Sequence, residues 1–225
     1  MRLVFWGTSS FAVPALRALL GEGFDVAGVV TQPDRAVGRS RSTLVASPVK
    51  AVAVEEELPL FQPETPRDEA FLAHFRALEP DLSIVVSYGH ILSESLIALP
   101  TYGTINVHAS LLPALRGAAP IQGAVRAGLA ETGVTVMRMV KALDAGPILL
   151  QARTPVARDE TAGELEARLS ELGALALVEA LTLMSLDRLP ETPQDESLAT
   201  YAPKIQREMA RIDWSRDAEE IGRHV

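Results

Sequence analysis

The chain has 225 residues, 48% of them hydrophobic, which suits one sizeable α/β core followed by a tail rather than two full domains. It contains no cysteine, which excludes disulfides, thiolate catalysis and zinc–thiolate sites and is typical of a cytoplasmic protein. The formal net charge of −8 argues against non-specific binding of nucleic acid over the whole surface.

The four histidines, at positions 74, 90, 108 and 224, show no metal-ligand spacing, so we expect no metal. The first apolar run, residues 3–6, is too short for a signal peptide, and no segment approaches the length of a membrane span. We therefore expect a cytoplasmic protein that does not associate with a membrane. The sequence gives no sign of an obligate protein partner.

The chain begins with a predicted strand over residues 3–6, which runs into the turn Gly7–Ser10. A turn between a strand and a helix is of the kind that can hold an anion against helix N–H groups. This turn lacks the Gly-x-Gly-x-x-Gly spacing, so a dinucleotide site is a weak interpretation. We expect Ser9 or Ser10 to cap a helix that continues to about Leu20.

After a second predicted strand, residues 25–31, comes a basic segment that runs from Arg35 to Thr43. It contains Arg35, Arg39 and Arg41 and no acidic residue, and we expect an exposed, flexible loop. In an acidic protein such a loop is a candidate for binding phosphate. A solvated loop that binds nothing fits the composition equally well.

Capping and periodicity signals predict most of the remaining elements. Ser47 and Pro48 have the residue types that open a helix, and Thr161 and Glu164 have the spacing of a capping box. The further expected strands are residues 60–61, 81–86, 104–107, 134–140 and 149–152, and the further expected helices are residues 47–57, 68–78, 118–127 and 161–184.

The strand over residues 104–107 leads into the segment that organises the rest of the chain. Ile105 and Val107 are its apolar positions, and Asn106 and His108 alternate with them. Because side chains alternate along a strand, Asn106 and His108 leave it on the same face. A polar residue at a strand end is, however, more often hydrogen-bonded scaffolding than a catalyst.

Asp144 lies in a second turn, residues 143–148, which follows another apolar run. Ligands in open α/β sheets bind beyond the carboxyl ends of the strands, so the polar exits at His108 and Asp144 make a candidate site. His90 follows a third strand, where a structural or solvent-facing role is favoured over a catalytic one.

Seven short segments carry the motifs of one family. They are Phe5–Thr8, Thr31–Asp34, Ser47–Lys50, Asn106–Pro113, Arg116–Gln122, Glu131–Val134 and Leu143–Gly146. With them the chain resembles, almost from end to end, the formyltransferases that use 10-formyltetrahydrofolate, and among these the methionyl-tRNA formyltransferase family. Asn-x-His with the later Asp is shared across the formyltransferases, whereas Ser110–Pro113, Arg116–Gln122 and the arginine loop are typical of the tRNA-formylating branch.

The resemblance implies a fold and a set of site residues. The implied fold is α/β, a doubly wound, Rossmann-like and mostly parallel sheet with helices on both faces. The implied catalytic residues are Asn106, His108 and Asp144, and the implied co-substrate is 10-formyltetrahydrofolate, without a metal. The implied folate-binding residues are Ser110, Leu111, Leu112, Pro113, Gly89, Ile91 and Leu92, and the implied tRNA-binding residues are Arg35, Arg39 and Arg41.

The resemblance also implies a domain organisation. Residues 1–189 correspond to the formyltransferase catalytic domain and residues 190–208, which contain several prolines, to a linker. Residues 209–225 correspond to the start of a C-terminal domain, which family members continue into a barrel-like unit that binds tRNA. We therefore expect a chain that is truncated before the end of that domain.

The proposed chemistry also follows from the residue types. Formyl transfer to an amine passes through a tetrahedral intermediate whose oxygen carries developing negative charge, and loss of one donor to such an oxygen costs on the order of 10²–10³ in rate. Asn106 and His108 offer N–H donors. Asp144 would favour the protonated imidazole if it lay close to it, and would relay the proton of the amine to the departing folate nitrogen.

We expect a one-carbon group transferase of translation initiation, which formylates the α-amine of methionyl-initiator tRNA. One alternative is a formyltransferase of the same fold that acts on a small amine such as glycinamide ribonucleotide or an amino sugar. Another is a non-catalytic nucleotide- or folate-binding module, against which the presence of all three catalytic positions speaks. A Rossmann oxidoreductase is the weakest hypothesis, since the glycine fingerprint is missing.

Overall fold

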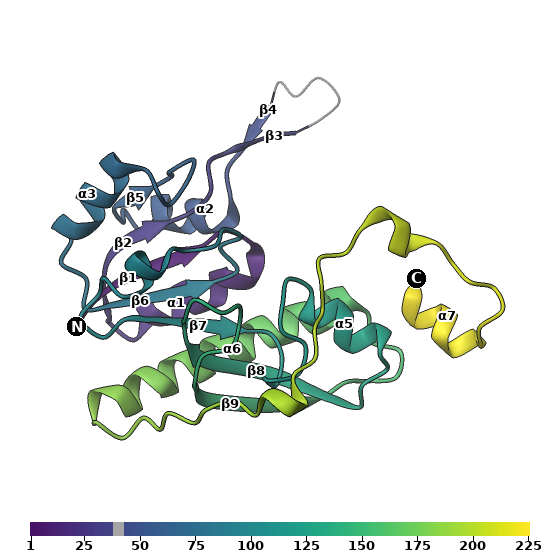
Figure 1. Cartoon of the computed structure of the whole chain (residues 1–225). Coiled ribbons are helices and arrows are strands. Elements are labelled where there is room, and N and C mark those ends of the chain that lie inside the picture. Colours follow the sequence, from purple (N-terminus) through teal and green to yellow (C-terminus); the bar gives the residue numbers. More distant parts are fainter. Residues whose placement is uncertain (38–42) are drawn as a thin grey trace.

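A seven-stranded sheet forms the centre of the computed structural model, which describes residues 1–37 and 43–225 (Figure 1). Its strands are β1 (Arg2–Gly7), β2 (Asp25–Val30), β5 (Leu60–Phe61), β6 (Leu82–Val86), β7 (Thr104–His108), β8 (Glu131–Arg138) and β9 (Ile148–Pro155). They lie in the order β5-β2-β1-β6-β7-β8-β9, with parallel neighbours from β5 to β7 and antiparallel pairs β7–β8 and β8–β9. The sheet is doubly wound and mostly parallel, which confirms the expected fold class.

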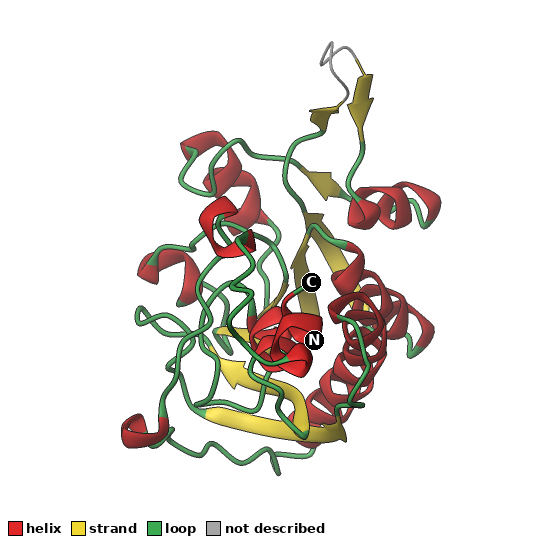
Figure 2. Ribbon diagram, turned by 90° about the vertical axis from the view of Figure 1, so that its right-hand side faces the viewer, coloured by secondary structure: helices red, strands yellow, loops and turns green. Residues whose placement is uncertain are grey.

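Helices cover both faces of this sheet (Figure 2). On one face the core is completed by α1 (Val13–Gly21), α2 (Pro48–Glu55), α5 (Pro120–Arg126) and α6 (Ala162–Ser185). On the opposite face it is completed by α3 (Glu69–Ala77) and α4 (Glu94–Ile97), and α7 (Ala218–His224) contacts α5 near the end of the chain.

The first strand shows why the sheet is buried on both sides. Leu3 and Phe5 of β1 belong to the core with α1 and α6, whereas Val4 and Trp6 belong to the opposite core with Phe71 of α3. A strand that is covered on both faces needs apolar residues at every position rather than at alternate ones. The run Leu-Val-Phe-Trp meets that requirement.

Trp6 is the centre of the second core. Its ring meets the rings of Phe71, Phe75 and Tyr88 edge-on, with centroids 5.6, 5.3 and 5.3 Å away, an arrangement that aromatic quadrupoles favour. Its indole Nε1–H donates to the hydroxyl of Ser83 at 3.1 Å, so the polar end of the buried ring is satisfied. This cluster joins the carboxyl-terminal halves of β1 and β6.

The cap that we expected for the first helix is wrong. Ser9 makes no side-chain cap; its hydroxyl donates across to the hydroxyl of Ser87 at 2.7 Å, just after β6. A 3-10 turn, Ser10–Ala12, follows, and α1 begins only at Val13. The expected caps at Ser47 and in the Thr161–Glu164 capping box are both confirmed.

The basic segment is partly strand. Arg35–Val37 (β3) and Thr43–Val45 (β4) pair antiparallel and form an arm that projects from the carboxyl end of β2 (Figure 1). The expectation of a loop throughout is therefore wrong at both ends of the segment, because their backbone groups pair with each other. Arg39 and Arg41 lie outside the described residues.

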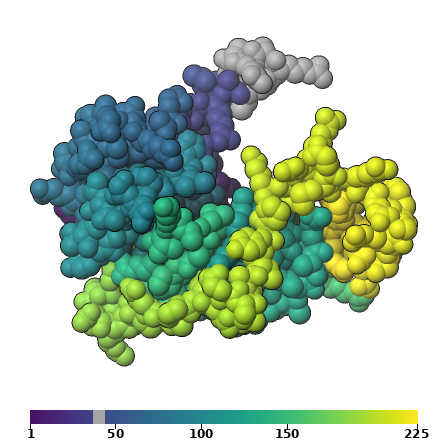
Figure 3. Space-filling view, in the orientation of Figure 1, coloured from purple at the N-terminus to yellow at the C-terminus, as the bar shows by residue number. Residues whose placement is uncertain are grey.

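Beyond α6 the chain returns to the sheet. Residues 192–202, which we call the strap, run along the surface of the central part of the chain, as the yellow-green segment in Figure 3 shows. Thr192 forms a bridge with Ile148 of β9, and Tyr201 forms a bridge with Arg116. Further along, 3-10 turns occupy Glu196–Leu198 within the strap and Arg207–Ala210 beyond it. The division into catalytic domain, linker and C-terminal domain stays a prediction.

Two properties of the described chain bear on its function. None of the helices in residues 1–37 and 43–225 combines the length and hydrophobicity that crossing a membrane requires. In the same residues, no three or more His, Asp or Glu side chains gather where they could hold a metal ion.

We predict that Ser83→Ala destabilises the fold, since it leaves the buried Nε1–H of Trp6 without its acceptor. The free energy of unfolding, measured by urea denaturation, should fall by about 1–3 kcal/mol. The matched change Ser10→Ala, at an exposed serine, should stay within about 0.5 kcal/mol of the unchanged chain. Equal values for the two variants would contradict the importance of this hydrogen bond.

Candidate active site

The end of β7 places two polar side chains on the face of the sheet opposite α6. Ile105 and Val107 are buried in the core with α6, so Asn106 and His108 point to the other side, as the alternation predicted. Over β7, β8 and β9 that side is covered by chain segments rather than by a long helix: the loop 109–119, the turn 139–147 and the strap. The candidate site lies among these segments.

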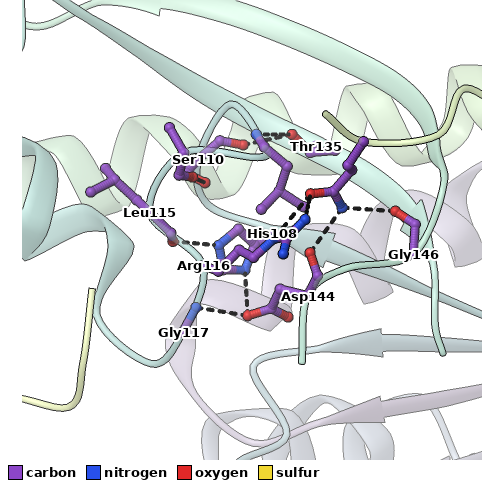
Figure 4. A network of polar contacts seen from close by, with 11 residues as sticks. His108, Ser110, Leu115, Arg116, Gly117, Thr135, Asp144 and Gly146 are labelled. Atoms are coloured by element: carbon purple, nitrogen blue, oxygen red, sulfur yellow. Dashed lines mark hydrogen bonds and ion pairs between the residues drawn. The ribbon is translucent and has the colours of Figure 1, made fainter. Parts of the chain in front are cut away.

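The ring of His108 lies between two oxygen atoms (Figure 4). Its Nε2 is 2.9 Å from the carbonyl oxygen of Leu115, and its Nδ1 is 3.8 Å from Oδ2 of Asp144. The two side chains of His108 and Asp144 are only 7% and 12% exposed. An imidazole with a proton on each nitrogen presents a donor to both oxygens.

Asp144 reaches His108 by a route that differs from the expected one. We expected the two residues at neighbouring carboxyl ends of strands, but β8 is antiparallel to β7, and its last residue, Arg138, pairs with Ile105. The strand therefore ends roughly 10 Å from the level of His108. The turn 139–147 folds back across the face of the sheet and brings the carboxylate to the ring.

The turn that carries Asp144 is held by hydrogen bonds from two other segments of the chain. Asp144 has a φ of 48°, in the left-handed region that Asp and Asn tolerate better than most residues. Its Oδ2 accepts a hydrogen bond from the backbone N–H of Gly117 at 2.8 Å. Its own carbonyl oxygen accepts one from the side chain of Gln194 at 2.8 Å. The position of the carboxylate thus depends on two other segments of the chain.

The loop after His108 is folded on Thr135 of β8. The hydroxyl of Thr135 donates to the carbonyl oxygen of Ser110 at 2.6 Å and accepts from the N–H of Leu112 at 3.1 Å. The hydroxyl of Ser110 donates to the carbonyl oxygen of Ala114 at 2.6 Å. The side chains of Ser110 and Leu112 are buried, so they stabilise the conformation of this loop.

The other predicted folate-binding residues differ in exposure. Leu111 and Pro113 are half-buried, Gly89 is exposed, and Ile91 is 78% exposed. Leu92 is buried in the core around Trp6. The folate-binding roles stay predictions, and the accessible positions in this set are 89, 91, 111 and 113.

Arg35 is tied to the exit of β6. Its guanidinium donates to Oε1 of Gln32, whose Nε2 donates to the carbonyl oxygen of Tyr88 at 2.9 Å. Gly89 has a φ of +88°, which favours glycine, and a Cβ there would lie 2.5 Å from the Gln32 amide and would displace it. His90 is half-buried with its ring 5.5 Å from that of Tyr88, and burial raises the pKa of Tyr88 to about 12.

Asp34 ties the base of the arm to α2 and β5. Its carboxylate accepts hydrogen bonds from Nζ of Lys50 at 2.7 and 2.8 Å and from the Gln62 amide at 2.9 Å. These two side chains hold the pKa of the Asp34 carboxyl below its usual value, with Lys50 the larger influence. The first residues of the arm are therefore anchored on the sheet.

A buried arginine joins the loop 109–119 to the strap. Arg116 is 1% exposed, and its guanidinium donates to both carboxylate oxygens of Glu196 at 2.7 and 2.8 Å. It also donates to Oε1 of Gln194 at 2.7 and 3.1 Å. Hydrogen bonding to Glu196 raises the pKa of Arg116 and lowers the pKa of Glu196. Gln194 and Glu196 were not among the predicted site residues, because nothing local distinguishes them from other polar residues of a proline-containing segment.

Comparison with known proteins identifies relatives over the whole chain. The model of the formyl transferase family matches residues 1–181. The chain is 51% identical over 225 residues to the methionyl-tRNA formyltransferase of Pseudomonas putida (strain GB-1). The matched region covers all of this chain and 72% of that protein. It is 48% identical, with the same coverage, to the methionyl-tRNA formyltransferase of Marinobacter nauticus.

Solved structures of lower identity share the fold. An N-formyltransferase from Helicobacter canadensis, in complex with folinic acid and dTDP-3-aminofucose, matches with a TM-score of 0.73 at 17% identity, over 99% of this chain and 78% of that one. Glycinamide ribonucleotide transformylase 1 from Symbiobacterium toebii matches with a TM-score of 0.69 at 24% identity, over 87% and 94%.

We predict that the Arg116–Glu196 pair contributes to the free energy of unfolding at neutral pH and that this contribution is lost at acidic pH. The lowered pKa of Glu196 means that its ionised form stabilises the fold at neutral pH and that this contribution is lost as the pH falls through the lowered pKa. The unfolding free energy of the unchanged chain should therefore exceed that of Glu196→Gln at pH 7, and the difference should shrink between about pH 5 and about pH 3.

The control is Glu208→Gln, at an exposed glutamate beyond the strap. Its unfolding free energy should run parallel to that of the unchanged chain over the same pH range. A constant difference between Glu196→Gln and the unchanged chain would show that this ion pair contributes nothing to the pH dependence.

Proposed function

Because the chain belongs to the formyl transferase family, we propose that it transfers the formyl group of 10-formyltetrahydrofolate to the α-amine of methionyl-initiator tRNA. The observation that carries the proposal is identity of about half, over all 225 residues, to relatives named methionyl-tRNA formyltransferase. The contact between His108 and Asp144 supports it, since it brings an imidazole and a carboxylate together at one site.

In the proposed reaction the nitrogen of the α-amine attacks the formyl carbon, and the formyl oxygen becomes an oxyanion. The amide of Asn106 leaves β7 on the same face as His108 and is half-buried, so it is available as a donor to that oxygen. A protonated His108 ring adds positive charge beside the same oxygen. Both groups then stabilise the tetrahedral intermediate more than the planar substrate.

Asp144 has the role of proton relay in this proposal. The amine loses a proton when the new C–N bond forms, and the folate nitrogen gains one when the old C–N bond breaks. Oδ2 of the Asp144 carboxylate lies 3.8 Å from Nδ1 of His108 and accepts from Gly117, whereas Oδ1 accepts from no group in the described part of the chain. It can therefore accept the first proton and deliver the second, directly or through water.

The folate site that we propose lies beside the loop after His108. The accessible members of the predicted set, Gly89, Ile91, Leu111 and Pro113, come from the exits of β6 and β7, which are adjacent parallel strands. The N-formyltransferase from Helicobacter canadensis, which shares this fold, was solved with folinic acid, and this supports a folate as the formyl donor.

The arm β3–β4 is the proposed contact for tRNA. It leaves the carboxyl end of β2, and His108 stands at the carboxyl end of β7, so both lie at the same edge of the sheet. Three strand spacings, roughly 14 Å, separate the two strands. We assign phosphate binding to Arg35, Arg39 and Arg41, whose charges suit the acceptor arm of a tRNA.

We predict that Asn106→Ala, His108→Ala and Asp144→Asn each lower the rate of formyl transfer on the order of 10²–10³-fold in a single-turnover assay. Asn suits the left-handed backbone at position 144 and keeps an oxygen for the N–H of Gly117, so this change removes mainly the charge. Circular dichroism should show an intact fold in all three variants. The exposed His74→Ala serves as control, and a variant with a near-normal rate would remove its residue from the mechanism.

The acceptor is tested by comparing methionyl-tRNA, glycinamide ribonucleotide and an amino sugar nucleotide in one assay. We expect turnover with methionyl-tRNA, and we expect Arg39→Gln with Arg41→Gln to lower kcat/KM for the tRNA without changing folate affinity. The slope of log kcat/KM against log salt should decrease by about 1 to 2, because two phosphate contacts are lost. Arg76→Gln, at an exposed position of α3, is the control. Turnover with a small amine alone would overturn the assignment of the acceptor.

A further inference from the structure

The side chain of Gln194 connects two segments that are far apart in the sequence. Its Nε2 donates to the carbonyl oxygens of Asp144 at 2.8 Å and Gly146 at 2.7 Å. Its Oε1 accepts from Nε and Nη2 of Arg116 at 3.1 and 2.7 Å. A carboxamide has two N–H donors and one acceptor oxygen, so every polar group of this side chain is engaged.

The two connected segments supply both partners of the His108 ring. The turn at 144–146 carries the carboxylate that faces Nδ1, and the loop at 115–117 carries the carbonyl that faces Nε2. The same loop donates the N–H of Gly117 to Asp144. The distance between these segments therefore sets the geometry on both sides of the ring.

Both segments hold backbone conformations that ordinary residues rarely adopt. Leu115 has a φ of 59° and Asp144 a φ of 48°. Such conformations persist only where the surrounding structure enforces them. At Leu115 the strap does so, because Thr200 accepts from the N–H of Leu115 through its hydroxyl and from the N–H of Arg116 through its carbonyl, each at 2.8 Å.

We propose that Gln194 is a positioning residue for the His108–Asp144 pair, through which the docked strap holds the turn 144–146 at the correct distance from the ring. Its importance for catalysis rests on the proposed function, whereas its effect on the ring does not. The carboxylate of Glu196 accepts hydrogen bonds from the guanidinium of Arg116 independently of Gln194. Loss of Gln194 therefore leaves the strap docked through Glu196 and removes one of the two contacts that hold the turn, the other being the N–H of Gly117 on Asp144.

Two substitutions at this position separate its two connections. Gln194→Glu keeps an oxygen for Arg116 but replaces the donor with an oxygen that faces the carbonyl oxygens of Asp144 and Gly146, which repel it. Gln194→Ala removes both connections. Gln206→Ala makes the same change at an exposed glutamine just beyond the strap and serves as the matched control.

The experiment measures the melting temperature, kcat and both KM values of the three variants, together with the ring nitrogen NMR signals of His108, assigned with His108→Ala. Misplacement of a catalytic group by about 1 Å costs on the order of 10²-fold in rate. We therefore expect Gln194→Glu and Gln194→Ala to lower kcat by roughly 10- to 100-fold, with KM values near those of the unchanged chain. We also expect both to shift the His108 signals across the pH range, and Gln206→Ala to change none of these quantities.

Unchanged His108 signals in Gln194→Glu, with a folded chain, would overturn the inference. A fall in kcat that only follows the loss of folded protein, with the ring signals unmoved, would overturn it too. If the unchanged chain formylates none of the acceptors, the proposed function fails, and the His108 signals alone then decide whether Gln194 positions the ring.

Discussion

A guanidinium that is removed from water needs a partner for its charge and acceptors for its N–H groups. Arg116 finds these on the strap, in the carboxylate of Glu196 and the amide oxygen of Gln194. The strap must therefore lie against the loop 109–119, and its position places the other end of the Gln194 amide on the turn of Asp144. One buried charge thus determines how three distant segments meet around His108.

The change from parallel to antiparallel strands decides where the candidate site lies. Parallel strands need crossover connections, which are commonly helices, whereas antiparallel strands can be joined by a turn. The turn 139–147 between β8 and β9 leaves one face of this half of the sheet without a crossover helix. Loops and the strap cover that face instead, and Asn106 and His108 point into this cover. The N-formyltransferase from Helicobacter canadensis and glycinamide ribonucleotide transformylase 1 share the fold at TM-scores of 0.73 and 0.69 although their names differ, so the fold alone does not identify an acceptor.

Local signals in the sequence predicted most of the elements. The apolar run 3–6 and the alternation over 104–108 indicated strands and the faces of their side chains, and the capping box at Thr161 marked the start of α6. These signals act between residues that are close along the chain. Where a distant residue competed, the prediction was wrong, as at Ser9, whose hydroxyl bonds Ser87 instead of capping a helix.

The sequence by itself determined most of the strands and helices along the chain, the shared face of Asn106 and His108, and membership of a family through motifs. Only the tertiary structure decided how Asp144 approaches the ring, since β8 runs antiparallel and its turn folds back over the sheet. It also decided the parts played by Gln194 and Glu196, which hydrogen-bond to a residue 78 and 80 positions away. Contacts of that range depend on how complete elements pack, and no local pattern of residue types encodes them.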